Sequence, residues 1–166
     1  MRLAVLSDTH ANSEKAAKVF ERLRPHLAGV DGILHAGDVT CAELLEMLEA
    51  VAPLYAVAGN MDGDDLREGL GEQRLLELGG RRLGLIHGWG SPGDLPRRVA
   101  GRFAAPAGQP QVEAIVFGHS HQPLVETVGG VLLVNPGSPT DRYFAPYRSM
   151  AFLELGAEIK AEIVRL

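Results

Sequence analysis

Near its start the chain reads Leu3-Ala4-Val5-Leu6-Ser7-Asp8-Thr9-His10, an apolar run that passes directly into an acid and a histidine. A short apolar run of this kind is typical of a strand buried on both faces of a sheet. The same pattern, a buried strand followed by Asp, Asn or His, recurs at Asp38, Asn60, His87 and His119. Because ligands of α/β sheets lie beyond the carboxyl ends of the strands, the repeated pattern predicts a site at one edge of the fold.

Helices are predicted between the first three buried strands, whereas hairpins dominate the second half of the chain. Helices over Ser13–Arg24, with Ser13 as the cap, and from the capping box Thr40–Glu43 separate predicted strands at Leu3–Ser7, Gly32–His35 and Leu54–Ala58. Further on, Gly79-Gly80, Gly129-Gly130 and Gly156-Ala157 each join two apolar runs, and a helix over Leu95–Phe103 and a buried strand over Val112–Phe117 are expected. This order predicts an α/β fold with two sheets packed face to face and helices outside.

The composition limits the class of protein. The 166 residues fit one domain spanning residues 1–166, and the net charge of −5 argues against general binding to nucleic acids or membrane surfaces, which needs a basic face. The single cysteine, Cys41, excludes an intrachain disulfide and a zinc site built from thiolates. No apolar stretch is long enough to span a membrane, and Asp8 comes too early for a signal peptide, so we expect a cytoplasmic protein.

Seven polar side chains are expected to converge where the buried strands end. They are Asp8, His10, Asp38, Asn60, His87, His119 and His121, which include four of the six histidines. Each one alone has an ordinary explanation as a turn residue or a packed histidine. Together, converging carboxylates would repel one another without a cation, so the pattern predicts a metal centre. Nitrogen and oxygen ligands without thiolate suit Mn, Fe, Zn, Co or Ni, and so many ligands indicate two metals that share a carboxylate.

The motifs resemble a known family. Asp8-Thr9-His10, Gly37-Asp38, Gly59-Asn60-Met61-Asp62, His87 and Gly118-His119-Ser120-His121, in this order, resemble the five motifs of calcineurin-like metallophosphoesterases. Asn135-Pro136-Gly137-Ser138, followed by Arg148, resembles the small YfcE-like phosphodiesterase branch, which also includes the small retromer subunit. The resemblance extends from Asp8 to about Leu155 and implies a four-layer α-β-β-α sandwich of two mixed sheets with a dinuclear site at its edge.

The resemblance also implies a role for each residue. Asp8, His10 and His121 would hold one metal, Asn60, His87 and His119 the other, and Asp38 would bridge them. The cofactor expected is a pair of divalent ions, Mn²⁺ in the first place and Ni²⁺, Zn²⁺, Fe²⁺ or Co²⁺ as alternatives, whose bound hydroxide would attack phosphorus in line. Asp38, Asn60 and His119 are expected to act in catalysis. The implied function is a metal-dependent phosphodiesterase; a phosphomonoesterase or nucleotide phosphatase, a retromer-like scaffold and a metal-binding regulatory module are the alternatives.

Two departures from the family pattern bear on the substrate. Met61 stands where phosphatases of the wider superfamily have a His thought to protonate the leaving group, and methionine has no proton to donate. This favours diesters or activated aryl esters, unless Asp62 or water is the acid; Asp62 has the alternative role of capping the Gly59–Asp65 turn. Trp89 stands where relatives often have His, and it is expected either to stack on a base or aryl group or to cover the core edge. Arg148 is expected to bind substrate phosphate, with surface pairing as the alternative.

The remaining signals concern the surroundings of the site. Gly88–Gly93 matches G-x-G-x-x-G, but its prolines delay a helix, so a loop beside the site is expected rather than a dinucleotide site. His35 is expected either to orient a ligand or to pack in the core. Gly37, Gly59 and Gly118 each precede a proposed ligand, where a missing side chain lets the chain turn. The expected partner is a small phosphate ester, and a homo-oligomer is left open.

Overall fold

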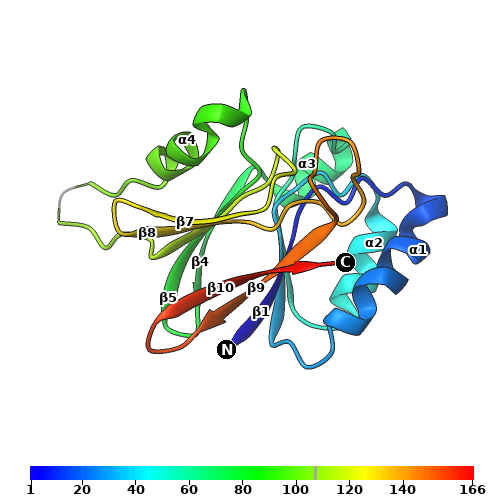
Figure 1. Cartoon of the computed structure of the whole chain (residues 1–166), viewed down its shortest axis with the longest axis horizontal. Helices are drawn as coiled ribbons and strands as arrows, with labels where there is room; N and C mark the ends of the chain where they lie inside the picture. The colour runs from blue at the N-terminus through cyan, green and yellow to red at the C-terminus, as the bar shows by residue number, and fades with distance from the viewer. Residues whose placement is uncertain (107) are drawn as a thin grey trace.

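The computed structural model describes residues 1–106 and 108–166. Ten strands are found: β1 Arg2–Leu6, β2 Gly32–His35, β3 Leu54–Ala56, β4 Gln73–Leu78, β5 Arg81–Ile86, β6 Ala114–Val116, β7 Leu124–Val128, β8 Val131–Asn135, β9 Ser149–Leu155 and β10 Ile159–Arg165. They form two five-stranded sheets, ordered β10-β9-β1-β2-β3 and β4-β5-β6-β8-β7 (Figure 1). Both sheets are mixed, because β1, β2 and β3 run parallel, as do β5, β6 and β8, while β4, β7, β9 and β10 each pair antiparallel with their neighbours.

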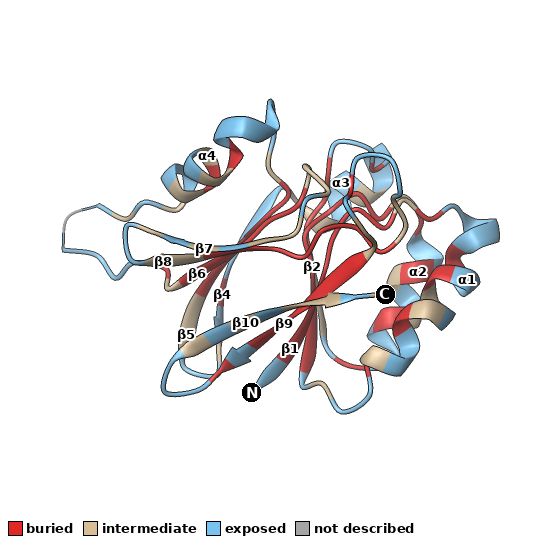
Figure 2. Ribbon diagram, viewed as in Figure 1, coloured by how far each residue is buried: buried red, intermediate tan, exposed pale blue. Residues whose placement is uncertain are grey.

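The buried apolar residues form three clusters, and each cluster fills the space between two neighbouring layers of helices or strands. Along β1, Leu3 and Val5 pack against the second sheet, whereas Ala4 and Leu6 pack against helices, because side chains alternate between the faces of a strand. Helices α1 (Ser13–Leu23) and α2 (Ala42–Glu49) cover the first sheet, and α4 (Leu95–Arg102) covers the second, each with a buried face (Figure 2). The predicted α-β-β-α sandwich of two sheets is therefore confirmed.

The helix starts differ from the prediction in their caps. The side chain of Asn12, and not Ser13, caps α1 by accepting a hydrogen bond from the Lys15 N–H. The capping box predicted at Thr40–Glu43 is wrong, since Cys41 is the N-cap of α2 and makes no side-chain cap bond. The Thr40 hydroxyl donates instead to the carbonyl of Ala11, at 2.7 Å. Thr40 thus links two neighbouring loops rather than closing its own helix.

The remaining differences between the predicted and the observed elements lie mostly in the segments that follow the strands. An additional helix, α3 (Asp64–Leu70), was not predicted, and β3 and β6 end one or two residues earlier than expected. Short 3-10 turns, η1 (Arg24–His26) and η2 (Pro92–Asp94), follow α1 and precede α4. The Gly88–Gly93 segment is a loop with this turn at its end, so α4 begins only at Leu95, as its prolines indicated. Within the described ranges, no helix is both long and apolar enough to cross a membrane.

Candidate metal centre

The loops that follow five strands of the two sheets meet at one edge of the sandwich. In the first sheet, the Asp8 N–H donates to the carbonyl of Gly37 at 3.0 Å, which joins the loops after β1 and β2. In the second, the Gly118 N–H donates to the carbonyl of His87 at 3.0 Å, which joins the loops after β5 and β6. The His119 N–H then donates to Oδ2 of Asp8 at 3.0 Å and ties the two sheets together. All seven side chains expected at the site come from these loops.

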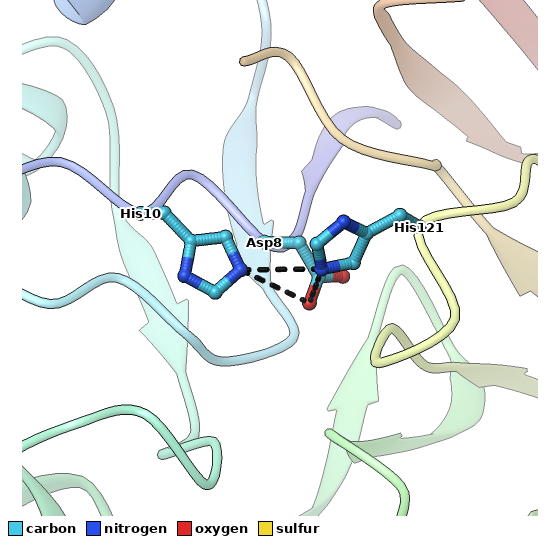
Figure 3. Close-up of side chains that lie close together, drawn as sticks. All are labelled: Asp8, His10 and His121. Carbon is cyan, nitrogen blue, oxygen red and sulfur yellow. Dashed lines mark hydrogen bonds and ion pairs between the residues drawn. The ribbon is translucent and has the colours of Figure 1, made fainter. Parts of the chain in front are cut away.

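One group consists of Asp8, His10 and His121, whose ligand atoms lie within 4.8 Å of one another (Figure 3). Nε2 of His121 is 3.3 Å from Oδ1 of Asp8 and 3.2 Å from Nε2 of His10. On its other side, Nδ1 of His121 lies 2.6 Å from Oδ2 of Asp141. Because a carboxylate only accepts, Nδ1 carries a proton and Nε2 is the nitrogen that faces the group.

A second group consists of Asp8, Asp38 and His87, again with ligand atoms within 4.8 Å of one another. Nδ1 of His87 donates to the carbonyl of Ala36 at 2.7 Å, so Nε2 is the nitrogen that faces Oδ2 of Asp38, at 3.3 Å. The exposed Asn60 and the half-buried His119 extend this group. Oδ1 of Asn60 lies 3.2 Å from Nε2 of His87 and 3.0 Å from Nδ1 of His119.

The donor set fits a cation. Oδ1 of the buried Asp8 has no hydrogen-bond partner among the described residues, although it faces Nε2 of His10, His87 and His121 within 3.9 Å. A buried oxygen left in this way is costly, and a positive ion placed among these atoms would satisfy it. Burial lowers the pKa of His121, but the Asp8 and Asp141 carboxylates outweigh it and raise the pKa to about 9. A proton and a metal ion therefore compete for Nε2 of His121.

Asp38 is placed to be an anion in the middle of the site. Burial raises the pKa of its carboxyl group, but His87 and the N–H of Met61 more than offset this, and the pKa ends below its usual value. Oδ1 accepts the Met61 N–H at 2.7 Å. Oδ2 faces both groups, at 3.3 Å from Nε2 of His87 and 3.7 Å from Nε2 of His10. One carboxylate oxygen thus lies between the two sets of imidazoles.

The backbone of these loops is left-handed at many of the ligand positions. Among the described residues, positive φ outside glycine occurs at Asp8, His10, Asp38, Thr40, His119 and His121, with values from 42° to 70°. This conformation is unfavourable for residues with a Cβ and persists only where the surroundings enforce it. The strain therefore lies at the site, and the contacts around the loops must hold it there.

Glycines let these loops approach one another, as expected from the sequence. A Cβ at Gly118 would lie 1.8 Å from Oγ of Ser7, and one at Gly59 would lie 2.1 Å from Oδ1 of Asp38. Both distances are far below any allowed contact, so only glycine fits. The expectation that the residues before Asp38, Asn60 and His119 need to lack a side chain is met at these positions, and Gly37 has a φ of +91° as well.

The side chain of Asp62 joins two of the loops that carry candidate ligands through hydrogen bonds to their backbone. Its Oδ2 accepts the N–H groups of Asp38 at 3.0 Å and Gly59 at 2.7 Å, and its Oδ1 accepts the Thr40 N–H at 2.7 Å. Of the two roles considered for Asp62, the structure shows the cap of the Gly59 turn and extends it to the Asp38 loop. Both oxygens of this buried carboxylate are therefore engaged by backbone N–H groups of the two loops.

His35 braces the loops from inside the core. Its Nδ1 accepts the Gly37 N–H at 3.2 Å, so Nε2 carries the proton and lies 3.1 Å from the Thr9 hydroxyl. Burial lowers the pKa of His35 to about 4, despite nearby carboxylates. A neutral imidazole thus connects the Asp8 and Asp38 loops, which combines the packing and orienting roles weighed from the sequence.

The Asn135–Ser138 motif supports the site from the second sheet. The Ser138 hydroxyl donates to the carbonyl of Asp8 at 2.7 Å, and Nδ2 of Asn135 donates to the carbonyl of Gly118 at 2.9 Å. Asp141, three residues further on, is the functional residue that the sequence did not reveal. A signal existed, since histidine ligands commonly have a carboxylate partner and Asp141 is the first acid after the motif.

A cavity of about 680 Å³ opens beside Asn60 and His87. Its lining includes Trp89, which is 45% exposed, together with Arg67 and Arg102. Arg148 is not part of this lining; its Nε donates to the carbonyl of Thr140 at 3.2 Å. Of the two residues expected to bind substrate, the structure therefore places Trp89 next to the candidate ligands and Arg148 on a separate loop.

Comparisons with known proteins agree with this geometry. A curated relative, a probable metallophosphoesterase from Methanothermobacter thermautotrophicus, is 35% identical over 99% of this chain and 92% of its own. A phosphodiesterase from Methanocaldococcus jannaschii is 26% identical over 82% of this chain and 83% of its own. The crystal structure of Vps29 complexed with Zn²⁺, from Entamoeba histolytica, is similar with a TM-score of 0.71 and 25% identity over 99% of each chain.

The match to a family model covers nearly the whole chain. The model describes the calcineurin-like phosphoesterase superfamily domain, and it matches residues 1–158. The two-sheet fold, the two candidate metal-binding groups and the curated relatives all agree with that assignment. The chain therefore belongs to the calcineurin-like phosphoesterase superfamily.

Proposed function

We propose that this protein is a phosphodiesterase that works with two divalent cations. The observation that carries the proposal is the buried Oδ1 of Asp8, which lacks a hydrogen-bond partner among the described residues and is surrounded by the Nε2 atoms of three histidines. A buried carboxylate oxygen of this kind needs positive charge beside it, which bound cations would supply. The similarity to a phosphodiesterase from M. jannaschii supports the same reaction class.

The proposed ligand sets follow from the two groups. Asp8, His10 and His121 would hold one ion, and Asn60, His87 and His119 the other. Asp38 would bridge them, because its Oδ2 faces Nε2 of both His10 and His87. Nitrogen and oxygen donors without thiolate favour Mn²⁺, with Ni²⁺, Zn²⁺, Fe²⁺ and Co²⁺ as alternatives. When bound, such ions neutralise phosphate oxygens and lower the pKa of water.

The chain's own residues would fix the orientation of these ligands. Asp141 holds the ring of His121, the carbonyl of Ala36 holds His87, and the carbonyl of Gly90 accepts from Nε2 of His119 at 2.9 Å. Each contact sets which nitrogen is free to bind a metal. The neutral amide of Asn60 would leave its ion more electrophilic than a carboxylate would. Asp38, Asn60 and His119 are therefore the residues we assign to catalysis.

The substrate preference rests on the missing proton donor. Met61 is 61% exposed at the position beside Asn60, and its thioether has no proton to donate. Asp62 is buried and engaged by three backbone N–H groups, so it does not replace the missing acid. A leaving group must then depart unprotonated or take its proton from water. Diesters with stable leaving groups, such as aryl esters, satisfy this condition best.

The cavity beside Asn60 and His87 is the proposed subsite for the leaving group. Its volume of about 680 Å³ is within the range of small-molecule sites. The indole of Trp89 offers a planar apolar surface there, which is suited to stacking on an aryl group or a base. Arg67 and Arg102 line the same cavity together with Glu68 and Glu72, so it offers charged groups of both signs. We therefore assign Trp89 to substrate binding.

Metal reloading tests the proposal. The protein is stripped with a chelator, reloaded with Mn²⁺, Ni²⁺ or Zn²⁺, and given bis-p-nitrophenyl phosphate beside p-nitrophenyl phosphate. We expect metal-dependent turnover with preference for the diester. A His87→Ala variant should lose this activity, whereas His26→Ala, which alters a histidine outside both groups, should keep it. Preference for the monoester would favour the phosphomonoesterase alternative instead.

A binding scaffold is the second candidate function. It is favoured by the similarity to Vps29, which was crystallised with Zn²⁺. A scaffold predicts that the protein binds two equivalents of metal and hydrolyses neither ester. Metal content and turnover, measured on the same sample, separate the two functions.

A further inference from the structure

Two large aromatic side chains stand in solvent beside His121. Tyr143 is 94% exposed and Phe144 is 76% exposed. The Phe144 ring meets the ring of His121 edge to face, with centroids 6.2 Å apart and planes at 82°. Adjacent exposed aromatic residues at the border of a candidate site form a surface on which a ligand can stack.

The loop that carries these rings is fixed by the carboxylate that also orients His121. Asp141 accepts the N–H groups of Tyr143 at 2.8 Å, Phe144 at 3.2 Å and Ala145 at 3.1 Å. The same Oδ2 that binds the last two also meets Nδ1 of His121 at 2.6 Å. The position of the aromatic pair is therefore set relative to the candidate metal ligand, as a recognition element requires.

Three arginines surround the same loop. Nη1 of Arg22 donates to the carbonyl of Pro139 at 3.0 Å, Nε of Arg148 donates to that of Thr140, and Arg142 is exposed next to Tyr143. In the described part of the chain, none of the three has a carboxylate within 4.0 Å. Burial and the charges of Arg22 and Arg142 lower the pKa of Arg148. Like charges gathered without a carboxylate at ion-pair distance would be stabilised by an anionic ligand.

We propose that the loop from Asp141 to Arg148, which we call the aromatic loop, binds the second substituent of the phosphodiester and that this substituent is a nucleotide. Its base stacks on Tyr143 and Phe144, and a further phosphate group meets the arginines. A nucleotide is the substituent that combines a planar ring with negative charge, which are the two properties this loop matches. The inference rests on the proposed function and adds a substrate class to it.

Substrates with a common leaving group test the aromatic part. With the Mn²⁺-loaded protein, kcat/KM is measured for methyl p-nitrophenyl phosphate and for the p-nitrophenyl ester of thymidine 5′-phosphate. We expect the thymidine ester to be preferred and the ratio of the two values to fall about tenfold in a Tyr143→Ala/Phe144→Ala variant, mainly through KM. Because both esters are hydrolysed at the same metal site, general damage to that site lowers both kcat/KM values equally and leaves their ratio unchanged. Val51→Ala, which changes an exposed apolar residue before β3 at the opposite edge, should leave the ratio unchanged.

A second comparison tests the arginines. A 3′-phosphate added to the thymidine ester should lower its KM severalfold, and Arg142→Gln should remove that gain. Calorimetric titration with thymidine 3′,5′-bisphosphate gives a readout without turnover, and its affinity should fall in both variants. Tyr143→Ser alone replaces the double variant if that protein does not fold.

The outcomes separate this inference from the function on which it rests. Turnover of the methyl ester without preference for the thymidine ester would overturn the role of the aromatic loop and leave the phosphodiesterase intact. A ratio unchanged by the double variant would do the same, and it is the result expected if the loop binds a protein partner instead. Turnover of neither ester would overturn the proposed function itself.

Discussion

The floor and the rim of the site are built in opposite ways. The floor consists of Asp8, His35, Asp38, Asp62 and His87, which are all buried and, apart from one oxygen of Asp8, hydrogen-bonded to neighbouring parts of the chain. The rim consists of Asn60, Met61, Trp89, Tyr143 and Phe144, which are all exposed. The floor therefore holds the candidate metal ligands in place. The rim is free to vary without disturbing the core, and under the proposed function it would select the substrate.

Asp38→Ala is the change expected to have the largest effect, because it removes the carboxylate proposed to bridge the two ions. We expect metal content and esterase activity to be lost together. Elemental analysis of the purified variant and turnover of bis-p-nitrophenyl phosphate measure both, and circular dichroism verifies the fold. A variant that still binds two metals per chain would refute the bridging role of Asp38. It would also show that the buried floor is less decisive for metal binding than the comparison with the rim implies.

His35 makes the stability of the floor depend on pH. Burial lowers its pKa to about 4 in the folded protein, below the ordinary value of 6.5. The unfolded chain thus binds an extra proton between these values, and stability falls as the pH drops from 6.5 to 4. At about 1.4 kcal/mol per pH unit, the loss from this one group reaches roughly 3 kcal/mol.

His35→Gln removes that titration. Urea unfolding of the metal-free protein at pH 7.5 and pH 4.5, with and without the substitution, isolates the contribution of His35. The variant should be less stable at pH 7.5 and should lose less stability on acidification than the wild-type protein. Equal losses in both proteins would show that His35 is protonated in the folded state.

Asp141 lies between floor and rim, and its removal should have an intermediate effect. Asp141→Asn keeps the size of the side chain but weakens the hydrogen bond that orients His121. We expect the affinity for one of the two metals to fall about 10- to 100-fold. Competition with a chelating dye measures it. Two unaltered metal affinities would show that the packing of the loop, and not the carboxylate, positions His121.

Trp89→Ala should have the smallest effect. Loss of a stacking surface worth about 1 kcal/mol raises KM for an aryl diester roughly fivefold, with kcat and metal content unchanged. Met61→Ala is the matched control, since Met61 is an exposed apolar rim residue that does not line the cavity. An unchanged KM for Trp89→Ala would mean that the indole only covers the edge of the core.

The floor and the rim around Asn60 and Trp89 were predictable from the sequence, whereas the part of the rim formed by Tyr143 and Phe144 was not. Asp8, Asp38 and His87 each follow a buried strand, and a strand delivers its next residue to the sheet edge whatever the loops do. Asp141 and Phe144 reach the site through a long irregular segment between β8 and β9, which has no period from which its path can be inferred.

The errors in the predicted helix caps also arose in loops, where the sequence pattern alone does not decide the structure. Asn12 and Ser13 are both good capping residues, and only the position of the first helical turn decides between them. The capping box at Thr40 failed because a hydroxyl that could cap its own helix found a carbonyl of the neighbouring loop instead. Tertiary contacts between loops decided both cases, and a local sequence pattern does not contain them.

The six left-handed residues of the ligand loops have a consequence for engineering. At about 1 kcal/mol each, they oppose folding by an amount comparable to the total stability of a small protein. Laboratory evolution for heat resistance alone would therefore be drawn to these positions, where glycine or asparagine relieves the backbone. Such a selection would dismantle the metal centre while improving the scaffold. Thermostable variants of this chain should be screened for metal content at every round.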